Sequence, residues 1–435
     1  MDTTLKTSIE NLATLERAHR DLRNWCRAHN FAGHDPFDGL NSQLFQATPF
    51  RNSRTARLAW TQLFKRSPIN FRKLARVPRE RNAKGMALFA LAALADYRRE
   101  QTKEAEVEAR ERLDDLIAMS LKGFSGACWG YNFDWQSRSF FASKGTPTVV
   151  PTAFAARALC EAAEVIDAAE YLPFVRTICN FILNDLKRSE ETSDEVCFSY
   201  SPIDHTRVFN ASLMAGEVLA TVGGLTGEVS LCDWAMRAAR YVIRRQRADG
   251  SWAYGGGGHQ TWTDNFHTAF ILTSLSRIAH RLAQISPLSA SGEGDGGEDG
   301  GAATPPQPLP TRGEGRVVHA GIENTLVRGY DYWKERFFLS NGWPKYFPNR
   351  LYPADTHSSA AAIVALAELR GRFPSTLELA EQIASWTIEN MQSPHGYFYY
   401  QRHRLYTNRI EYMRWSQAWM AYALARLMEC QNRPR

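Results

Sequence analysis

Two pairs of an aspartate and a histidine are the strongest candidates for chemistry in this chain. His267 follows Asp264 by three residues, and His357 follows Asp355 by two. Each aspartate stands eleven residues before a leucine of a small-residue, apolar segment. Paired carboxylates can act as general acid and base on a glycosidic bond, and histidine exchanges protons near neutral pH. We therefore expect Asp264 and Asp355 to be an acid/base pair assisted by the two histidines, although an aspartate at such a position also caps a helix.

Two other apolar segments are preceded by polar residues of the same kind. His205 stands before one of them, and Glu411, Tyr412 and Arg414 stand before the last one. If these segments are helices whose N-termini converge, the side chains join the same site. We therefore count Glu411 as a further candidate catalytic residue, and the other three as candidate substrate-binding residues.

Aromatic residues recur in the loops that lead into these segments. Trp252, Tyr254, Trp343 and Tyr346 belong to two such loops, and Trp129 belongs to a third. Aromatic faces stack on sugar rings, while tyrosine and tryptophan also hydrogen-bond at one end. Trp252, Tyr254, Trp343 and Tyr346 are predicted to form a sugar platform, and Trp129 is a further candidate substrate-binding residue. The alternative, strongest for Trp252 and Trp343, is that they pin one helical hairpin to the next, because large aromatics dominate protein cores.

The elements that must position these residues form a repeat. Six small-residue helices are predicted, with anchor leucines 56–65 residues apart at all but one interval. They are Gly85–Leu94, Pro151–Leu159, Ala211–Leu219, His267–Leu275, Ser358–Leu366 and Ser416–Leu424. Each is preceded by a more amphipathic helix, which suits an outer position with one wet face. These are Thr55–Phe64, Glu104–Ser120, Leu172–Leu186, Leu231–Arg245, Ile322–Phe337 and Leu377–Met391. Six such pairs predict an all-α fold, an (α/α)6 toroid with a cavity on its axis.

Three regions are expected along the chain. Residues 1–54 are predicted to be an N-terminal helical extension, and residues 55–285 and 317–435 the toroid. Residues 286–316 are rich in glycine, proline and acids, with almost no bulky apolar side chains, which predicts a disordered insertion. Removing that insertion restores the period at the one long interval.

The turn Gln246-x-x-Asp-Gly-Ser-Trp252 resembles the Gln–Trp motif of the terpenoid cyclase and prenyltransferase toroids. The helix-pair period is similar to that of six-hairpin glycosidases and uronyl C5-epimerase toroids. Taken whole, residues 55–430 resemble bacterial toroid proteins of surface-polysaccharide biosynthesis. The resemblance implies a carbohydrate-active enzyme that acts on a glycan, acidic or lipid-linked, by hydrolysis, elimination or epimerisation.

Two alternatives remain open at this point. One is a toroid that binds a glycan or an isoprenoid phosphate without chemistry. The other is an isoprenoid-converting enzyme, which is disfavoured because the Asp-x-Asp-Asp and Asp-Asp-x-x-Asp motifs of terpenoid enzymes are both missing.

Composition restricts the remaining classes. The net charge is +6 over 435 residues, but the basic residues are dispersed and form no nucleic-acid-binding module, so we expect no nucleic-acid partner. The seven cysteines are scattered singly and give no metal signature, so neither a metal nor a cofactor is expected. No apolar run is long enough to cross a bilayer, although peripheral membrane association stays open. The start of the chain lacks a secretory signal, which predicts a cytoplasmic protein.

Overall fold

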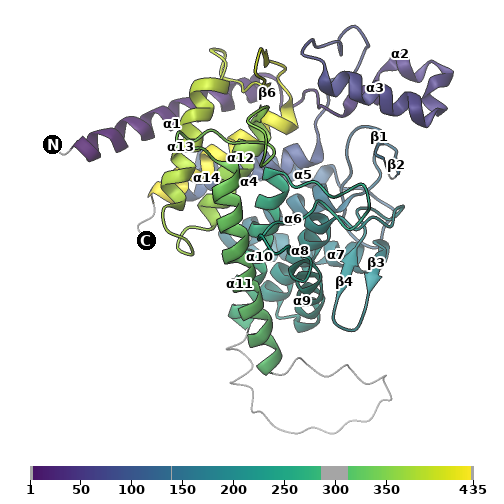
Figure 1. The fold of residues 1–435 in the computed structure, drawn as a ribbon, viewed down its shortest axis with the longest axis vertical. Coiled ribbons are helices and arrows are strands. Elements are labelled where there is room, and N and C mark those ends of the chain that lie inside the picture. The colour runs from purple at the N-terminus through teal and green to yellow at the C-terminus, as the bar shows by residue number, and fades with distance from the viewer. Residues whose placement is uncertain (1–2, 139, 286–311, 433–435) are drawn as a thin grey trace.

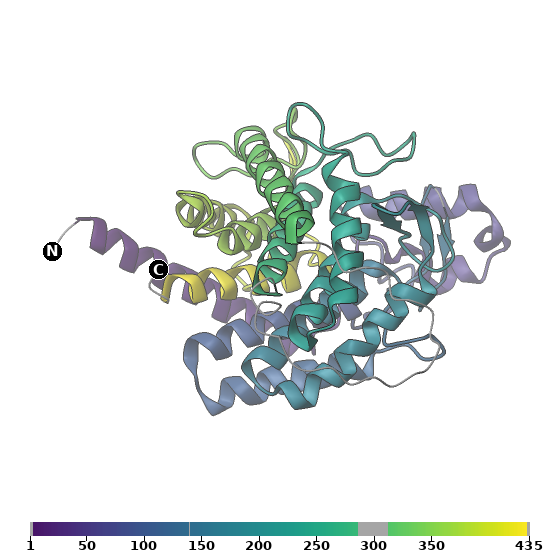
Figure 2. The same cartoon turned by 90° about the horizontal axis from the view of Figure 1, so that it is seen from below.

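Six helices form a closed inner ring in the computed structural model, which describes residues 3–138, 140–285 and 312–432. Each inner helix contacts the next, and the last contacts the first. Seen from below, the helices surround a common axis (Figure 2). The inner helices are α4 (Ala83–Glu100), α6 (Val149–Val165), α8 (Phe209–Thr226), α10 (Asn265–Ile285), α12 (Thr356–Glu368) and α14 (Trp419–Asn432).

Small residues explain why these helices occupy the inner ring. In α12, every residue from Thr356 to Ala367 is buried, and alanine and serine predominate. A side chain on Gly216 of α8 would place its Cβ 2.8 Å from the Cβ of Ala238 on the neighbouring helix. Such short side chains allow helix axes to approach closely, so two layers of helices pack without cavities between them.

Six amphipathic helices form the outer layer. Five of them alternate with the inner helices along the chain (Figure 1). They are α5 (Lys103–Ala118), α7 (Ala168–Asn180), α9 (Val229–Ile243), α11 (Arg312–Phe337) and α13 (Thr376–Met391). The sixth is α1 (Thr3–Ala28), which contacts α13 and α14 and carries His19 within 2.9 Å of Asp96 on α4.

A repeated hydrogen-bond pattern shows that α1 occupies a true outer position. Gln246, which follows α9, donates from Nε2 to the carbonyls of Gly250 and of Thr325 on α11. Gln392, which follows α13, donates in the same way to Gly396 and to Ala18 on α1. The glutamine of each turn therefore ties its hairpin to the next outer helix, and α1 takes that place beside α13.

Two helices differ from the sequence-based expectation. The helix expected at Thr55–Phe64 is present as α3 (Arg54–Arg66), but it contacts loop segments rather than an inner helix and stands beside the ring (Figure 1). It packs with the short elements η1 (Asp38–Asn41), α2 (Gln43–Gln46) and η2 (Pro49–Asn52) on a small apolar core of its own around Phe64. The helix α11 begins at Arg312, so residues 312–316 of the expected insertion are helical. Residues 286–311 lie outside the described residues.

The β-structure is confined to loops. Two antiparallel hairpins pair β1 (Trp135–Gln136) with β2 (Phe141–Ala142), and β3 (Arg188–Glu191) with β4 (Val196–Phe198). A three-stranded sheet follows the order β5 (Ala354–Asp355), β6 (Gln401–Arg402) and β7 (Thr407–Asn408). Two π-helical turns, η3 (Phe181–Asp185) and η5 (Met413–Ala418), extend α7 and precede α14. The all-α toroid expected from the repeat is confirmed, whereas the division of the chain at residue 54 stays a prediction.

Candidate functional site

A cavity of about 500 Å³ lies where the N-termini of the inner helices converge. Each of the six inner segments contributes a side chain from its first turn. The reason is that the inner helices of a toroid run parallel, so all of their N-termini lie on the same side of the ring. These side chains are Lys84 of α4, Val150 of α6, Asn210 of α8, His267 of α10, His357 of α12 and Arg414 of η5. Loop residues and α3 complete the wall.

Asp264 and His267 form a bonded pair in this wall. His267 Nδ1 lies 2.7 Å from Asp264 Oδ2, and the backbone N–H of His267 donates to Asp264 Oδ1 at 3.0 Å. The side chain of Asp264 is 2% exposed, whereas that of His267 is 21% exposed. Because an ionised carboxylate only accepts hydrogen bonds, it holds the proton on Nδ1 and leaves the Nε2 lone pair free. His267 is therefore oriented to accept a proton.

His357 is the second imidazole of the cavity. It is 1% exposed, and neither ring nitrogen has a hydrogen-bond partner among the described residues. Its ring centroid lies 4.4 Å from those of Phe266 and Trp415 and 4.8 Å from that of Trp419. Burial, reinforced by the nearby cations Lys84 and Arg414, holds the pKa of His357 well below its usual value. It is thus a neutral imidazole, able to accept a proton at one nitrogen and donate from the other.

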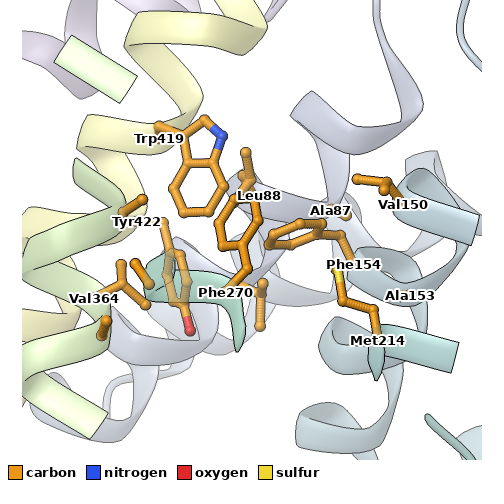
Figure 3. Packing of buried hydrophobic residues seen from close by; sticks show 14 of the residues in the cluster. Ala87, Leu88, Val150, Ala153, Phe154, Met214, Phe270, Val364, Trp419 and Tyr422 are labelled. Carbon is orange, nitrogen blue, oxygen red and sulfur yellow. The ribbon is translucent and has the colours of Figure 1, made fainter. Parts of the chain in front are cut away.

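The two imidazoles face a shared aromatic surface. The ring of Phe266 lies 4.0 Å from that of His267 and 4.4 Å from that of His357, and Phe270 lies about equally far from both. Below them, Phe270 stacks on Trp419 at 5.5 Å, and Phe154 meets Trp419 edge-on at 5.2 Å (Figure 3). Phe270 thus gives the cavity an apolar wall, which Trp419 and Phe154 support from behind.

Asp355 does not join Asp264 in the cavity wall. It is fully buried, caps α12 by accepting from the N–H of Ser358, and accepts from Gln401 Nε2 at 2.7 Å and from Trp415 Nε1 at 3.2 Å. Burial raises the pKa of Asp355 to about 6. All of its contacts are structural, so the expected pair of cavity carboxylates is not assembled.

Three other candidates also lie outside the cavity wall. Glu411 pairs with Arg79 at 3.7 Å, with a side chain 27% exposed. His205 is exposed, with Nε2 3.3 Å from Lys187 Nζ. Tyr412 is fully buried and accepts from Arg72 at 2.9 Å. A position just before an inner helix is therefore not sufficient to reach the cavity.

The aromatic candidates divide into two groups. Tyr254 and Tyr346 line the cavity. Trp252 and Trp129 are buried between helices, and their indole N–H groups donate to the carbonyls of Val242 and Leu116 on the preceding outer helices. Trp343 packs on Trp386, with ring centroids 4.7 Å apart. For these three tryptophans the packing interpretation fits the structure, and the sugar-platform interpretation does not.

Arg414 is fixed by the N-terminal segment. Its Nε and Nη2 donate to Asp35 Oδ2 and Oδ1 at 2.6 and 2.8 Å, and both side chains are almost fully buried. Nearby, Asp38 pairs with Arg72 at 2.6 Å. The loop His34–Asn41 therefore supplies two buried carboxylates that orient basic groups at the edge of the cavity.

Sequence reasoning missed several residues of the wall. Lys84 is the most important, and a signal for it existed: it follows the helix cap Asn82 by two residues, as His357 follows Asp355. The other missed side chains come from α3, from η5 and from loops far apart in the sequence, so their convergence could not be foreseen. They include the aromatic residues Tyr131, Trp135, Tyr200, Trp262 and Trp415, the basic residues Lys65, Arg66 and Arg138, and a third imidazole, His259.

Two features are absent from the described residues. No cluster of histidine, cysteine, aspartate and glutamate side chains with the geometry of a metal site occurs among them. In the same part of the chain, no helix combines the length and the apolar character needed to cross a membrane.

The arrangement of helices is similar to that of solved carbohydrate-active proteins. Cellobiose 2-epimerase from Bacillus thermoamylovorans B4167 superposes with a TM-score of 0.57 at 12% identity, over 81% of this chain and 90% of that chain. D-mannose isomerase gives 0.53 at 12% identity, over 79% and 86%. The GH76 α-mannanase of Bacteroides thetaiotaomicron gives 0.53 at 10% identity, over 80% and 86%.

No protein-family model and no curated protein matches the chain. At identities of 12% or less, the structural likeness establishes the fold, an α/α toroid, and leaves the chemistry to the site itself.

Proposed function

We propose that this protein is a carbohydrate-active enzyme that epimerises a sugar by proton transfer at carbon. The observation that carries this proposal is the composition of the cavity wall. Among the described lining residues, Asp264 is the only carboxylate, and it is bonded to His267, while His357 faces the same space with both ring nitrogens unpaired. Two imidazoles on different helices supply two separate acid/base groups, which is what an epimerisation requires.

The roles follow from the two environments. One imidazole removes the proton from a carbon next to a carbonyl group, and the electron pair moves onto the carbonyl oxygen to form an enediolate. The other imidazole returns a proton to the opposite face of that carbon. His267, oriented by Asp264, is suited to take the proton first. The guanidinium of Arg414 is suited to stabilise the developing negative charge on oxygen.

The cavity gives less support to the other reactions. Hydrolysis by the usual route needs two carboxylates flanking the bond, and Asp355 is occupied by Trp415, Gln401 and Ser358 outside the wall. An isoprenoid tail favours an apolar tunnel, whereas five cationic side chains reach this cavity, namely Lys65, Arg66, Lys84, Arg138 and Arg414. Toroids of similar fold include an epimerase and an isomerase of sugars, which is consistent with the proposal.

The wider setting is a proposal as well. A role in assembling surface polysaccharide and a lipid-linked form of the substrate rest on the sequence resemblance. These two, together with peripheral membrane association and a cytoplasmic location, stay predictions. The Asp264–His267–His357 assignment is likewise proposed rather than established.

Product analysis tests the reaction class. Purified protein is incubated with neutral and uronic-acid-containing oligosaccharides, and products are resolved by chromatography and NMR. We expect an epimer of unchanged chain length, with turnover reduced about 10²- to 10⁴-fold in His267→Asn and in His357→Gln. His205→Asn, which alters an exposed histidine outside the cavity, is the matched control and should keep full activity. Shortened chains would establish hydrolysis instead, and unchanged glycans would favour a non-catalytic binding toroid.

A further inference from the structure

Lys84 is a buried lysine that has no ion-pair partner among the described residues. Only 3% of the residue is exposed, and it lines the cavity from the first turn of α4. Its Nζ lies 4.6 Å from the ring centre of Phe154, 5.1 Å from Trp419 and 5.3 Å from Phe270. No carboxylate of the described residues lies within ion-pair distance of it. Figure 3 shows the three rings together at the axis of the toroid.

The surroundings of Lys84 are also positive. Within the cavity wall, Arg414 is paired with Asp35, and the carboxylate of Asp264 is bonded to His267 and to Trp262. Arg157 of α6, which also faces Lys84, pairs with Glu217 through two hydrogen bonds. Each of these groups has a partner from the protein, whereas Lys84 has no carboxylate at ion-pair distance among the described residues.

The inner helices add to the positive electrostatic potential around Lys84. All six inner positions present their N-terminal turn to the cavity, and each helix N-terminus carries a partial positive charge, of which caps such as Asn82 and Asp264 neutralise only part. A lysine in the first turn of α4 is unfavourable for the helix for the same reason. Because an unpaired buried charge is costly, the Lys84 amine holds a proton favourably only when an anion stands beside it, and no described residue supplies that anion as an ion-pair partner.

We propose that the cavity binds a sugar bearing an anionic group, with the Lys84 ammonium as its counter-ion. The aromatic rings around Lys84 contact the body of the sugar, and the anionic group reaches the Nζ. Either a uronic-acid carboxylate or a sugar phosphate has the required chemistry. That the anion belongs to a sugar rests on the proposed function, whereas the anionic character rests on Lys84 and the converging helices alone.

Binding should be coupled to proton uptake. Burial, with Arg414 and Arg157 adding to it, holds the pKa of Lys84 well below its usual value, and Asp35 opposes this effect only weakly. The groups that face Lys84 are Arg414 from η5, Arg157 from α6, His357 from α12 and Asp35 from the N-terminal loop. An anion at Nζ raises the pKa of the amine, so the complex takes up a proton from solvent. His357 can also take up a proton when an anion binds. The Lys84→Met variant described below separates the proton uptake of Lys84 from that of His357.

Isothermal titration calorimetry tests this inference. Glucuronate, glucose 6-phosphate and glucose are titrated into the full-length protein in two buffers of different ionisation enthalpy. We expect both anionic sugars, or one of them, to bind about 10- to 100-fold more tightly than glucose, with proton uptake. Lys84→Met should abolish the preference and reduce the proton uptake, while Lys84→Arg should keep the preference. Lys144→Met, at a lysine whose side chain is 52% exposed, is the matched control.

The binding measurement can fail independently of the turnover assay. Equal affinity for charged and neutral sugars, lack of binding by either anionic sugar, or an anionic preference that survives Lys84→Met in a folded protein would overturn the inference. Folding of each variant is checked by circular dichroism. Anionic preference without any epimer formation would refute the proposed reaction but leave the binding site intact.

Discussion

The pairing of Asp35 with Arg414 allows a sharp prediction about stability. Asp35→Asn keeps the size of the side chain but removes the charge that balances a guanidinium only 3% exposed. Two hydrogen bonds, at 2.6 and 2.8 Å, are weakened or lost, together with one that Asp35 accepts from the N–H of Phe37 at 3.0 Å. Removing one partner of a buried ion pair costs about 3–5 kcal/mol, because the other charge is left buried and unpaired. We expect the free energy of unfolding to fall by that amount.

Urea denaturation followed by circular dichroism measures the change. The double variant Asp35→Asn/Arg414→Met should be less destabilised than the sum of the single variants by about 2 kcal/mol or more, because it removes both charges. Glu170→Gln, at an exposed pair with Arg110, is the control and should cost less than about 1 kcal/mol. An Asp35→Asn protein within about 1 kcal/mol of the wild type would refute the idea that the N-terminal loop fixes Arg414 energetically.

Two further predictions concern the aromatic residues and the pH dependence. Trp252→Ala should lower the free energy of unfolding by about 3–5 kcal/mol, because Trp252 is only 1% exposed. Trp262 is 40% exposed, and its ring stacks on that of Tyr254 with centroids 4.6 Å apart. Trp262→Ala should therefore change the free energy of unfolding by less than about 1 kcal/mol but weaken sugar binding about 10-fold. Equal destabilisation by the two changes in urea titrations would contradict this division. Burial raises the pKa of Asp355 to about 6, above about 3.9 for a free side chain, so the folded state holds that proton more tightly than the unfolded chain. The wild type should therefore lose about 2 kcal/mol of stability relative to Asp355→Asn as the pH rises from about 4 to about 6, and parallel stability profiles of the two proteins would exclude this role for Asp355.

The fold was largely predictable because it is repetitive. The spacing of the small-residue helices predicts six inner helices, and their common orientation predicts that His267, His357 and Arg414 lie at one end of the ring, as they do. The closing outer helix was not predictable in the same way. Its key contact joins Gln392 to Ala18, 374 residues apart, and α3 has the amphipathic pattern of an outer helix although it packs elsewhere.

The site was predictable only in part for a related reason. A polar residue that precedes an inner helix either lines the cavity or forms hydrogen bonds with other side chains, and those side chains can come from distant segments. Asp355 is occupied by Gln401 and Trp415, which are 46 and 60 residues away. No local pattern distinguishes it from Asp264, whose partners Trp262 and His267 are local.

Solvent isotope incorporation is the most direct test of proton transfer at carbon by the two imidazoles. An accepted glycan is incubated with the protein in D₂O, and its sugar C–H positions are followed by NMR and mass spectrometry. We predict deuterium at the single carbon that is inverted, lost when His267 and His357 are replaced together. Product formation with all carbon-bound protons retained, or with isotope entering only through newly formed reducing ends, would contradict the proposed proton transfer.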